Sequence, residues 1–541
     1  MITFIFTVFY NFIFLYGRGF LILLEKILGT HLINKKISGI KIVIFSPLIF
    51  LFFLGNLAFI ANFFIPTKFL IYVVAPLIFL NLFKIEQIKL NPNYVFNLLI
   101  IPLILGFSSF DIGLHFDAGL YHLNFQNWLR ESNLVLGITN IYSPYGWSSI
   151  NEYISSLFWI EDNFILLHFV QLIFLTQLFT FLFSNLTNKE NHLKFPSYLI
   201  LLFGVLDNFG VDGGRNGFYS IQSIGKFDTN FGILFLIFSL FILNQINNKD
   251  YSRSDLTFFS FLLVFCIQMK LTGLVCGILY LIYVYKFSKF HQDSFFSIFK
   301  QIKLPSLLGF LWILKNVLQS GCLFFTLEFT CFPNLSWYQS GYANALKITT
   351  NEFNNAFLFN MSIFAWFQEW YSVEINRTHI LNLIISISLI LLFKYFFFNL
   401  KKYNKTILFI GLFFILLKSI VWIIGAPDPR FAHGLFTLIV GFIGFNISGF
   451  KKYKFEINKK YLFYTVFFTC LILTPRINSY KSSLDSFFEF ISVNIPNVEY
   501  VSSEFWGEIP VNEECWVNLD CNRFNKDISK NNISFFTIFV D

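Results

Sequence analysis

The sequence predicts an all-α, polytopic integral membrane protein with roughly 12–14 transmembrane helices. Three observations lead to this prediction: the composition, the recurrence of long apolar runs, and the distribution of charge between those runs. Of the 541 residues, 56% are hydrophobic and only 13% are charged. A soluble fold cannot bury so much apolar surface, and we therefore expect lipid to be the solvent of this chain.

Apolar runs long enough to cross a bilayer recur along the chain as far as residue 475. The stretch 256–288 can be one long helix or two short ones, and we divide it near residue 270. The chain begins without a basic segment or a small-residue cleavage site, so no removed signal peptide is expected. The expected spans are 2–24, 42–65, 68–84, 94–109, 163–185, 196–209, 229–246, 256–270, 271–288, 304–325, 378–398, 406–424, 433–449 and 461–475.

Charge is distributed unequally between the segments that join these spans. One set of alternate segments contains 23 of the 39 Lys and Arg residues but only 7 of the 31 Asp and Glu residues. Because basic loops are retained in the cytoplasm, we expect this set to face inward, and dividing 256–288 in two keeps the alternation consistent. The set comprises 25–41, 84–90, 186–195, 247–255, 286–303, 394–405 and 450–460.

The remaining segments are then expected to face outward. The protein is thus expected to consist of a helical membrane domain, 1–475, and a short extracytoplasmic tail, 476–541, that caps the helices. The large outer loops of the membrane domain are 110–162 and 326–377. The net charge of +8 reflects the retained basic loops. Since no basic patch with interleaved aromatic residues occurs, nucleic acid is not an expected partner. The smaller outer segments are 210–228 and 425–432.

Two pairs of cysteines lie on predicted outer segments: Cys322 with Cys331, and Cys515 with Cys521. Each pair is close enough in sequence to form a small disulfide in an oxidising compartment, and the alternative is four free thiols. The other three cysteines lie in apolar runs, where we expect them in the core. Without a CxxC pair, a structural zinc site is not expected.

The outer loop 110–162 has the most distinctive pattern. From Tyr121 the sequence becomes helical, with Tyr121, Phe125 and Trp128 on one face and polar residues on the other. A short amphipathic helix with Tyr and Trp beside a span is expected to lie in the membrane interface. Asp117 is therefore expected at the bilayer surface, just ahead of an interfacial helix.

Ionisable residues occur within or beside the apolar runs, where each costs a few kcal/mol unless it is paired or faces water. The simplest physical account is that they meet in a polar cavity open to the outer leaflet. The alternatives are a snorkelling side chain for Lys418, an exposed turn for Lys270, and an ordinary loop acid for Asp117. His115 and His122 are either metal ligands beside Asp117 or interfacial histidines. The residues concerned are Asp207, Lys270, Lys315 and Lys418 within runs, and Asp111, Asp117, Lys226, Asp228 and Arg430 on outer segments.

This set of side chains suggests a chemistry. A carboxylate at the outer interface can act as general base, or hold a divalent metal, for attack on an anomeric carbon. Nearby cations can neutralise a departing phosphate. A sugar carried on a lipid phosphate would place its phosphate at this depth, and this chemistry needs neither a Gly-rich phosphate loop nor a Rossmann motif, both of which are missing from the sequence.

The stretch Asp117-Ala-Gly-Leu-Tyr121-His122-Leu resembles the D-x-x-x-Y-H-L-P motif of GT-C superfamily glycosyltransferases, with Asn124 where many relatives have Pro. These are polytopic enzymes that use polyprenyl-phosphate sugars. Further stretches, together covering roughly residues 100–430, are similar to an uncharacterised bacterial branch of GT-C-like membrane proteins. They are Ile224 to Asp228, Met269 to Gly273, Trp312 to Cys322, and Pro427 to Phe431.

The resemblance implies a GT-C-like fold in a bacterial inner membrane, with a site facing the periplasm or exterior and a role in the polysaccharides of the cell envelope. It implies membrane lipid and a polyprenyl-phosphate-linked sugar as partners. No metal ligands are assigned, because Asp111 is the only other acid near Asp117; a divalent metal stays open as a cofactor. The implied catalytic residues are Asp117 and Asp228, and the implied substrate-binding residues are Tyr121, His122, Lys226, Lys270, Lys315 and Arg430.

The leading functional hypothesis is an inverting glycosyltransferase that moves a sugar to an acceptor on the outer face. A transporter or flippase of lipid-linked glycans is an alternative, but it should show repeat symmetry and polar residues through the full membrane depth. A glycan polymerase or ligase would rely on basic residues in a late outer loop, where 326–377 offers only Lys347 and Arg377. A non-enzymatic membrane protein is the fourth possibility.

Overall fold

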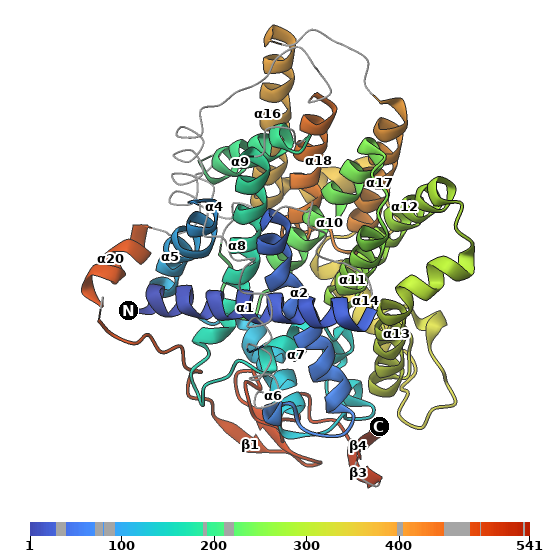
Figure 1. Cartoon of the computed structure of the whole chain (residues 1–541). Coiled ribbons are helices and arrows are strands. Elements are labelled where there is room, and N and C mark those ends of the chain that lie inside the picture. Colours follow the sequence, from blue (N-terminus) through green and yellow to red (C-terminus); the bar gives the residue numbers. More distant parts are fainter. Residues whose placement is uncertain are drawn as a thin grey trace.

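Helices make up most of the structure, and the strands of the described part all lie in the C-terminal tail (Figure 1). The long helices gather into one bundle, and the tail strands lie at one end of it beside α6 (Leu123–Glu131) and α7 (Ile150–Ser156). The computed structural model describes residues 1–28, 39–70, 79, 92–187, 192–209, 221–397, 404–447, 477–486, 488–533 and 536–540.

Eight helices of the described chain are long and apolar enough to cross a membrane, which confirms a polytopic, largely helical protein. Three further helices of 15 to 17 residues, α9 (Lys194–Phe209), α11 (Arg253–Met269) and α18 (His433–Ile447), pack among them. Expected span 461–475, and 68–84 apart from residues 68–70 and 79, lie outside the described residues. The eight are α1 (Ile2–Leu28), α2 (Gly39–Asn62), α8 (Ile165–Thr187), α10 (Asp228–Asn248), α12 (Val275–His291), α13 (Phe295–Ser320), α16 (Glu374–Phe397) and α17 (Lys405–Gly425).

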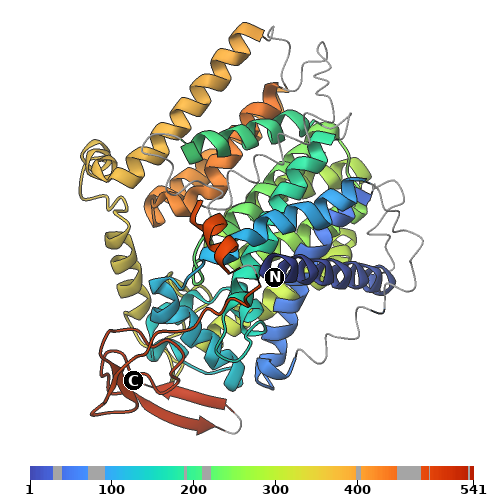
Figure 2. The same ribbon diagram turned by 90° about the vertical axis from the view of Figure 1, so that its left-hand side faces the viewer.

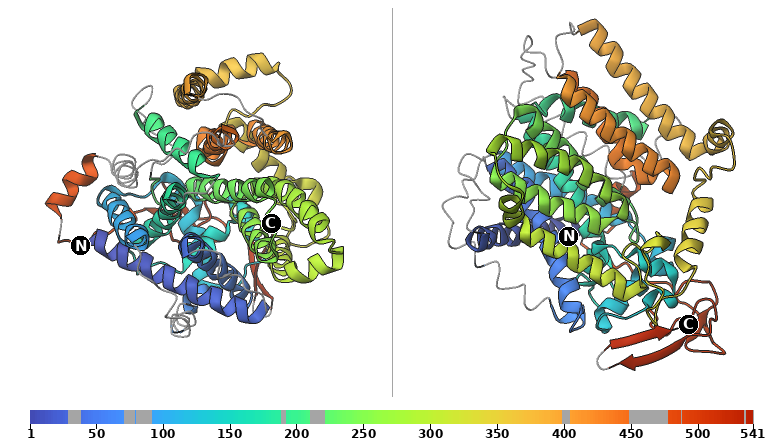
Figure 3. Two further views of the ribbon diagram at one scale, coloured as in Figure 1. Left: turned by 45° about the horizontal axis from the view of Figure 1, so that its top comes forward. Right: turned by 90° about the vertical axis from the view of Figure 1, so that its right-hand side faces the viewer.

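Burial separates central helices from peripheral ones. The apolar windows of α8 and α10 are each 94% buried, whereas those of α13, α16 and α17 are buried to 22%, 33% and 33%. A helix that is apolar on all sides and buried forms the centre of a bundle. The peripheral helices instead expose Leu, Ile and Phe, the surface that lipid covers in a membrane protein. Figures 2 and 3 show α16 standing at the edge of the bundle.

The expected span 94–109 is a continuous helical run whose hydrogen-bond pattern changes along its length. It packs against α1, which lies across the other long helices in Figure 1. A change from α to π pattern within a helix marks a local irregularity. The run consists of α4 (Pro92–Val95), the π-helix η3 (Phe96–Ile100), α5 (Ile101–Gly106) and the 3₁₀ turn η4 (Phe107–Asp111).

Loops that the charge pattern assigned to the inner side lie together at one end of the bundle. The guanidinium of Arg253 pairs with Asp293 at 3.3 Å, which joins the α10–α11 and α12–α13 connections. The Asn404 amide, at the start of α17, donates to Asn247 at the end of α10 with a distance of 3.3 Å. The structure thus groups the described parts of 247–255, 286–303 and 394–405, whereas most of 25–41 and all of 84–90 and 450–460 lie outside the described residues.

The segments assigned to the outer side meet at the opposite end. Asn140 of the first large loop donates to the carbonyl of Trp337 at 3.1 Å, and the indole of Trp370 donates to the carbonyl of Pro427 at 2.9 Å. Short helices build this end, and a Ser side chain caps the first turn of two of them, Ser149 in α7 and Ser362 in α15. They include η6 (Ile138–Asn140), η7 (Ser143–Trp147), η10 (Glu328–Thr330), α14 (Tyr342–Phe353), α15 (Ile363–Ser372) and η11 (Pro429–Ala432).

The C-terminal tail was expected to cap the helices. It packs on the outer loop 110–162 and also covers the start of α8, where the N–H of Phe164 donates to the carbonyl of Val493 at 3.0 Å. The backbone N–H of Leu136 donates to Thr537 at 2.9 Å, and the N–H of Phe539 donates back to Leu136 at 3.0 Å. The tail consists of α20 (Ile477–Asp485) and two antiparallel pairs, β1 (Tyr500–Ser502) with β2 (Glu508–Pro510) and β3 (Ser529–Ile533) with β4 (Phe536–Val540).

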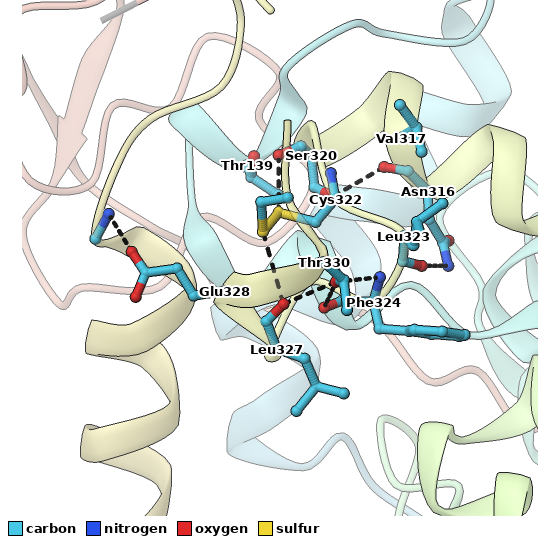
Figure 4. Close-up of a disulfide and its surroundings, with 12 residues drawn as sticks. Thr139, Asn316, Val317, Ser320, Cys322, Leu323, Phe324, Leu327, Glu328 and Thr330 are labelled. Atoms are coloured by element: carbon cyan, nitrogen blue, oxygen red, sulfur yellow. Dashed lines mark hydrogen bonds between the residues drawn. A yellow bond between two sulfur atoms is a disulfide. The ribbon is translucent and has the colours of Figure 1, made fainter. Parts of the chain in front are cut away.

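Both cysteine pairs that the sequence left open are disulfides, Cys322–Cys331 and Cys515–Cys521. Figure 4 shows the first, where the chain leaves α13. The hydroxyl of Thr330 accepts from the N–H of Phe324 at 3.1 Å and donates to the carbonyl of Leu327 at 2.7 Å, which closes the small loop. Of the described cysteines, Cys266 and Cys276 are buried free thiols, as expected for core residues.

The helix expected from Tyr121 onward is present as α6, preceded by the π-helix η5 (Ala118–His122). Its apolar face is buried, and so are Asn124 and Gln126 of its polar face, which are each 1% exposed. The tail covers that face: Asn127 donates to the carbonyl of Val517 at 2.7 Å. The polar side chains of α6 therefore hold protein together where an interfacial helix would present them to water; its depth in the membrane stays a prediction.

Candidate functional site

Two outer segments are joined by backbone hydrogen bonds at the start of the candidate site. The N–H of His115 donates to Ile224 at 2.8 Å, and the N–H of Ile224 donates to Gly113 at 3.0 Å. Gly225 follows with φ of +99°, and a Cβ at this position would lie 2.7 Å from the Cβ of Ala118. Only glycine tolerates both the backbone conformation and the contact. This bridge sets the residue pair 117–118 beside 226–228.

Asp117 lies at the centre of the site with 22% of its side chain exposed. Its carboxylate is 3.3 Å from Nδ1 of His115 and 3.9 Å from the Arg430 guanidinium. Burial alone would raise the pKa of Asp117, but the hydrogen bond and charge of His115, with the charges of His122 and Arg430, lower it overall. The carboxylate is thus ionised at neutral pH and accessible.

Arg430 is held by η11, the short turn between α17 and α18. The carboxylate of Asp428 accepts from the backbone N–H of Arg430 at 2.8 Å and pairs with its Nε at 3.1 Å. The guanidinium also lies over the ring of Phe431, 4.6 Å from the centroid. Burial lowers the pKa of Arg430, but the surrounding carboxylates of Asp228, Asp428 and Asp117 outweigh burial and raise it. Arg430 therefore links several acids from different segments.

Asp228 and Lys270 form an ion pair on the same side of the site. The ammonium of Lys270 donates to Asp228 at 2.9 Å and lies 3.6 Å from the centroid of the Phe431 ring. Asp228 is the first residue of α10, and Lys270 lies at the break between α11 and the 3₁₀ turn η9 (Leu271–Leu274). The break expected near residue 270 is thus what turns this cation toward the site.

Lys226 and Tyr121 complete the cluster. Burial and the charge of Arg430 lower the pKa of Lys226, against the opposite effects of Asp117 and Asp228. Burial, with the charges of Asp117, Asp228 and nearby acids, raises the pKa of the Tyr121 hydroxyl well above its usual value. These electrostatic interactions require proximity, so the structure brings Asp117, Tyr121, Lys226, Asp228, Lys270 and Arg430 together.

A buried carboxylate that the sequence did not single out lies behind His122. Glu152 of α7 is 4% exposed and accepts a hydrogen bond from Nδ1 of His122. Its other oxygen accepts from the amide of Gln126 at 2.7 Å, and Gln126 accepts in turn from the indole of Trp159 at 2.9 Å. No motif marks Glu152; its one sequence signal is an acid among apolar residues in a predicted outer loop.

The tail contacts this site from the outside. The N–H of Trp516 donates to the carbonyl of Gly119 at 2.9 Å, and the indole lies so close that a Cβ on Gly119 would be 2.7 Å from it. Trp516 belongs to the loop that the Cys515–Cys521 disulfide closes. The turn that carries Asp117 is therefore packed against a covalently closed loop.

Three ionisable residues that were expected in the same polar region make their closest contacts outside the cluster around Asp117. Lys315 is fully buried, donates to Ser148 at 2.7 Å and lies over the Trp312 ring. The other two are Asp207, which pairs with His379 at 3.6 Å between α9 and α16, and Lys418, which lies between the rings of Phe231 and Phe235. The sequence led us to expect one meeting point, and this is wrong for Asp207 and Lys315, which have partners of their own, whereas Lys418 lies near enough to Lys270 for their charges to interact.

Metal binding has little support in the donor set. Among the residues that the structure describes, no three His, Cys, Asp or Glu side chains are placed to hold a metal ion. Asp111, the second acid of the loop, is exposed at the end of η4. The carboxylates of Asp117 and Asp228 face cations instead, an arrangement suited to an ionised base beside an anion.

Comparison with known proteins assigns a family but no activity. Residues 1–437 match the model of a domain of unknown function, DUF8201, and the chain belongs to this family. No curated protein and no solved structure matches the chain.

Proposed function

We propose that this member of the DUF8201 family is a membrane glycosyltransferase that moves a sugar from a polyprenyl-phosphate donor to a hydroxyl group on the outer side of the membrane. The observation that carries the proposal is the half-buried cluster in which the ionised, accessible Asp117 lies 3.9 Å from Arg430. A base and an anion-binding group side by side are what displacement at a phosphate-bearing anomeric carbon needs.

In this proposal Asp117 takes the proton of the attacking hydroxyl. The oxygen of that hydroxyl forms the new bond to the anomeric carbon, and the bond from this carbon to the phosphate oxygen breaks with inversion. The electron pair leaves with the polyprenyl phosphate, whose charge Lys226, Lys270 and Arg430 stabilise. Asp228 keeps Lys270 in place through their 2.9 Å ion pair.

Two further observations support an outward location. Both disulfides lie at the end of the bundle that carries the site, and disulfides persist in oxidising compartments. The described basic connections 247–255 and 286–303 lie at the other end, where the charge rule expects the cytoplasmic side. We accordingly propose the exterior face of a bacterial cytoplasmic membrane.

The first prediction concerns Asp117→Asn in purified protein reconstituted with a set of polyprenyl-phosphate-linked hexoses and pentoses. Since the amide cannot accept the proton, we expect turnover, measured as released polyprenyl phosphate by mass spectrometry, to fall by about a hundredfold or more. The matched control is Asp111→Asn, which removes an exposed acid of the same loop and should leave turnover unchanged. Activity retained by Asp117→Asn, or a wild-type protein inert toward every donor, contradicts the proposal.

A further inference from the structure

Behind the proposed base lies a hydrogen-bonded chain of four side chains: Trp159, Gln126, Glu152 and His122. Each link is directional. The indole N–H of Trp159 can only donate, so it fixes the oxygen of Gln126 toward itself at 2.9 Å and turns the amide NH₂ toward Glu152 at 2.7 Å. Both oxygens of Glu152 accept, one from Gln126 and one from His122.

The chain determines which nitrogen of His122 carries the proton. A carboxylate oxygen is an acceptor, so Nδ1 must hold the hydrogen that lies between His122 and Glu152. The ring is fixed between Tyr121, at 4.0 Å between centroids, and Phe227, at 5.0 Å. In the neutral imidazole, Nε2 is then a hydrogen-bond acceptor on the opposite side of the ring.

The ring of His122 adjoins the proposed site. It lies between Tyr121 and Phe227, and the chain neighbours of Phe227, Lys226 and Asp228, belong to that site, while Glu152 is almost completely buried. Carboxylate–imidazole pairs elsewhere use the buried acid to set the tautomer and orientation of a ring that works at its other nitrogen. Glu152 and His122 have the geometry of such a pair, with Glu152 as the buried acid.

We propose that Glu152 is a positioning residue that keeps the proton of His122 on Nδ1, so that Nε2 accepts a hydrogen bond from a hydroxyl group of the sugar bound beside Asp117. This inference rests on the proposed function and adds a specificity contact to it. The hydroxyl belongs either to the donor sugar or to the acceptor, and it is a different hydroxyl from the one that Asp117 deprotonates.

Glu152→Gln tests the inference with little change of shape. If the oxygen of the new side chain keeps its bond from Gln126, its NH₂ group faces Nδ1 of His122. The imidazole must then accept at Nδ1 and carry its proton on Nε2. A single substitution thus turns Nε2 from an acceptor into a donor, while the bonds among residues 126, 152 and 159 persist.

The first readout needs no activity. Protein labelled with ¹⁵N-histidine, in liposomes and alkaline buffer, gives the tautomer of His122 by solid-state NMR, with the signal assigned by its loss in His122→Asn. We expect a proton on Nδ1 in the wild type and on Nε2 in Glu152→Gln. A wild-type His122 protonated on Nε2 overturns the inference, even if the variant fails to fold.

The second readout uses the donor that the wild type turns over fastest. We expect the KM for one substrate to rise about five- to tenfold in Glu152→Gln, the effect of one lost hydrogen bond, with a smaller change in kcat. Whether the KM rises for the donor or for the acceptor shows which of the two substrates carries the hydroxyl. Unchanged KM values with intact turnover overturn the inference and leave the proposed function standing. Absent wild-type turnover with the expected tautomers removes the function and the sugar contact that rests on it, and leaves only the control of the His122 tautomer by Glu152.

Asp255→Asn is the matched control. Asp255 is 7% exposed and accepts from the amide of Gln245 at 2.9 Å, so this variant changes a buried acid–amide bond of the same kind at the inner end of the bundle. Both readouts should stay at their wild-type values. A KM shift as large as that of Glu152→Gln would assign the effect to general loosening of the fold and overturn the positioning role.

Discussion

At the scale of single residues, the state of Asp117 depends on neighbours that can be removed one at a time. Nδ1 of His115 lies 3.3 Å from its carboxylate and 3.1 Å from its backbone nitrogen. The hydrogen bond and charge of His115 are the leading influences that lower the pKa of Asp117 against the opposing effect of burial. His115 thereby extends the pH range in which the base is ionised.

The pH dependence of His115→Ala follows from this arrangement. A base must be ionised to work, so activity falls as the pH drops through its pKa. Removing His115 raises the pKa of Asp117, and we expect the acid limb of the pH–activity profile to move to higher pH. His192→Ala, at an exposed position at the inner end, should leave the limb in place. A limb that stays or moves to lower pH in His115→Ala would show that Asp117 does not set it.

Residue identities explain which parts of the site the sequence could predict. Asp117, Asp228 and Arg430 stood out because charges beside apolar runs are costly, and the structure brings them together. Glu152 escaped notice because its role comes from a contact with His122, 30 residues away, that no local pattern encodes. Lys315 was misplaced because its partner Ser148 and the Trp312 ring hold it in a separate buried site.

At the scale of elements, the bridge between the first outer loop and the segment before α10 sets residues 117–118 beside residues 226–228. It consists of two backbone hydrogen bonds between 113–115 and Ile224, followed by Gly225 with its positive φ. The sequence showed both segments as outer loops, but hydrogen bonds between loops follow from tertiary packing. Residues 210–220, which precede this bridge, lie outside the described part of the chain.

Gly225→Ala tests the bridge. The new Cβ would meet Ala118 at 2.7 Å in a backbone conformation that disfavours a side chain, so we expect a loss of about 1–3 kcal/mol in stability. Because the contact lies next to Asp117, turnover should fall by more than the loss of folded protein explains. Thermal unfolding in detergent and the donor assay measure the two effects.

Gly277→Ala is the control for that substitution. Gly277 lies within α12, and a Cβ there meets nothing within 4 Å. Alanine also favours the helix by up to about 1 kcal/mol, so stability should hold or rise slightly. Equal losses in the two variants would show that the close approach at Gly225 has no special role.

At the scale of the whole molecule, the helices follow the apolar runs closely, because length and hydropathy determine a span. The contacts of the tail and of α6 could not be predicted in this way, because an amphipathic pattern does not show what covers the polar face of a helix. From the sequence we expected water or lipid headgroups over Asn124 and Gln126, but the tail and α7 cover these side chains. Helices marked by a local apolar run were thus predictable, whereas surfaces formed between distant segments were not.

The sidedness of the site can be tested by labelling. Phe116, adjacent to Asp117, is 54% exposed, and Lys289 lies on the exposed surface at the opposite end of the bundle. We expect a membrane-impermeant maleimide to label Phe116→Cys in intact cells, and Lys289→Cys only after the membrane is opened. The unsubstituted protein serves as the control for its native thiols. The reverse pattern would place the site in the cytoplasm and remove the proposed chemistry.

The closed loop 515–521 gives a further prediction. Replacing both Cys515 and Cys521 by Ser should cost about 2 kcal/mol for a loop of this size and release Trp516 from Gly119. We expect a lower unfolding temperature together with a loss of turnover. The same replacement at Cys322 and Cys331 is the control, because it lowers stability in a loop that does not carry Trp516. Equal turnover losses would argue against a specific role of the tail.

The pairing of Leu136 with residues 537 and 539 has a consequence for biogenesis. Ribosomes deliver the first outer loop hundreds of residues before β4, so under the proposed outward location this loop waits across the bilayer during synthesis with its partner strand still unmade. Under that proposal, activity would arise only once β4 has also been translocated. A nascent protein stalled before β4 is made should therefore be inserted into the membrane but inactive.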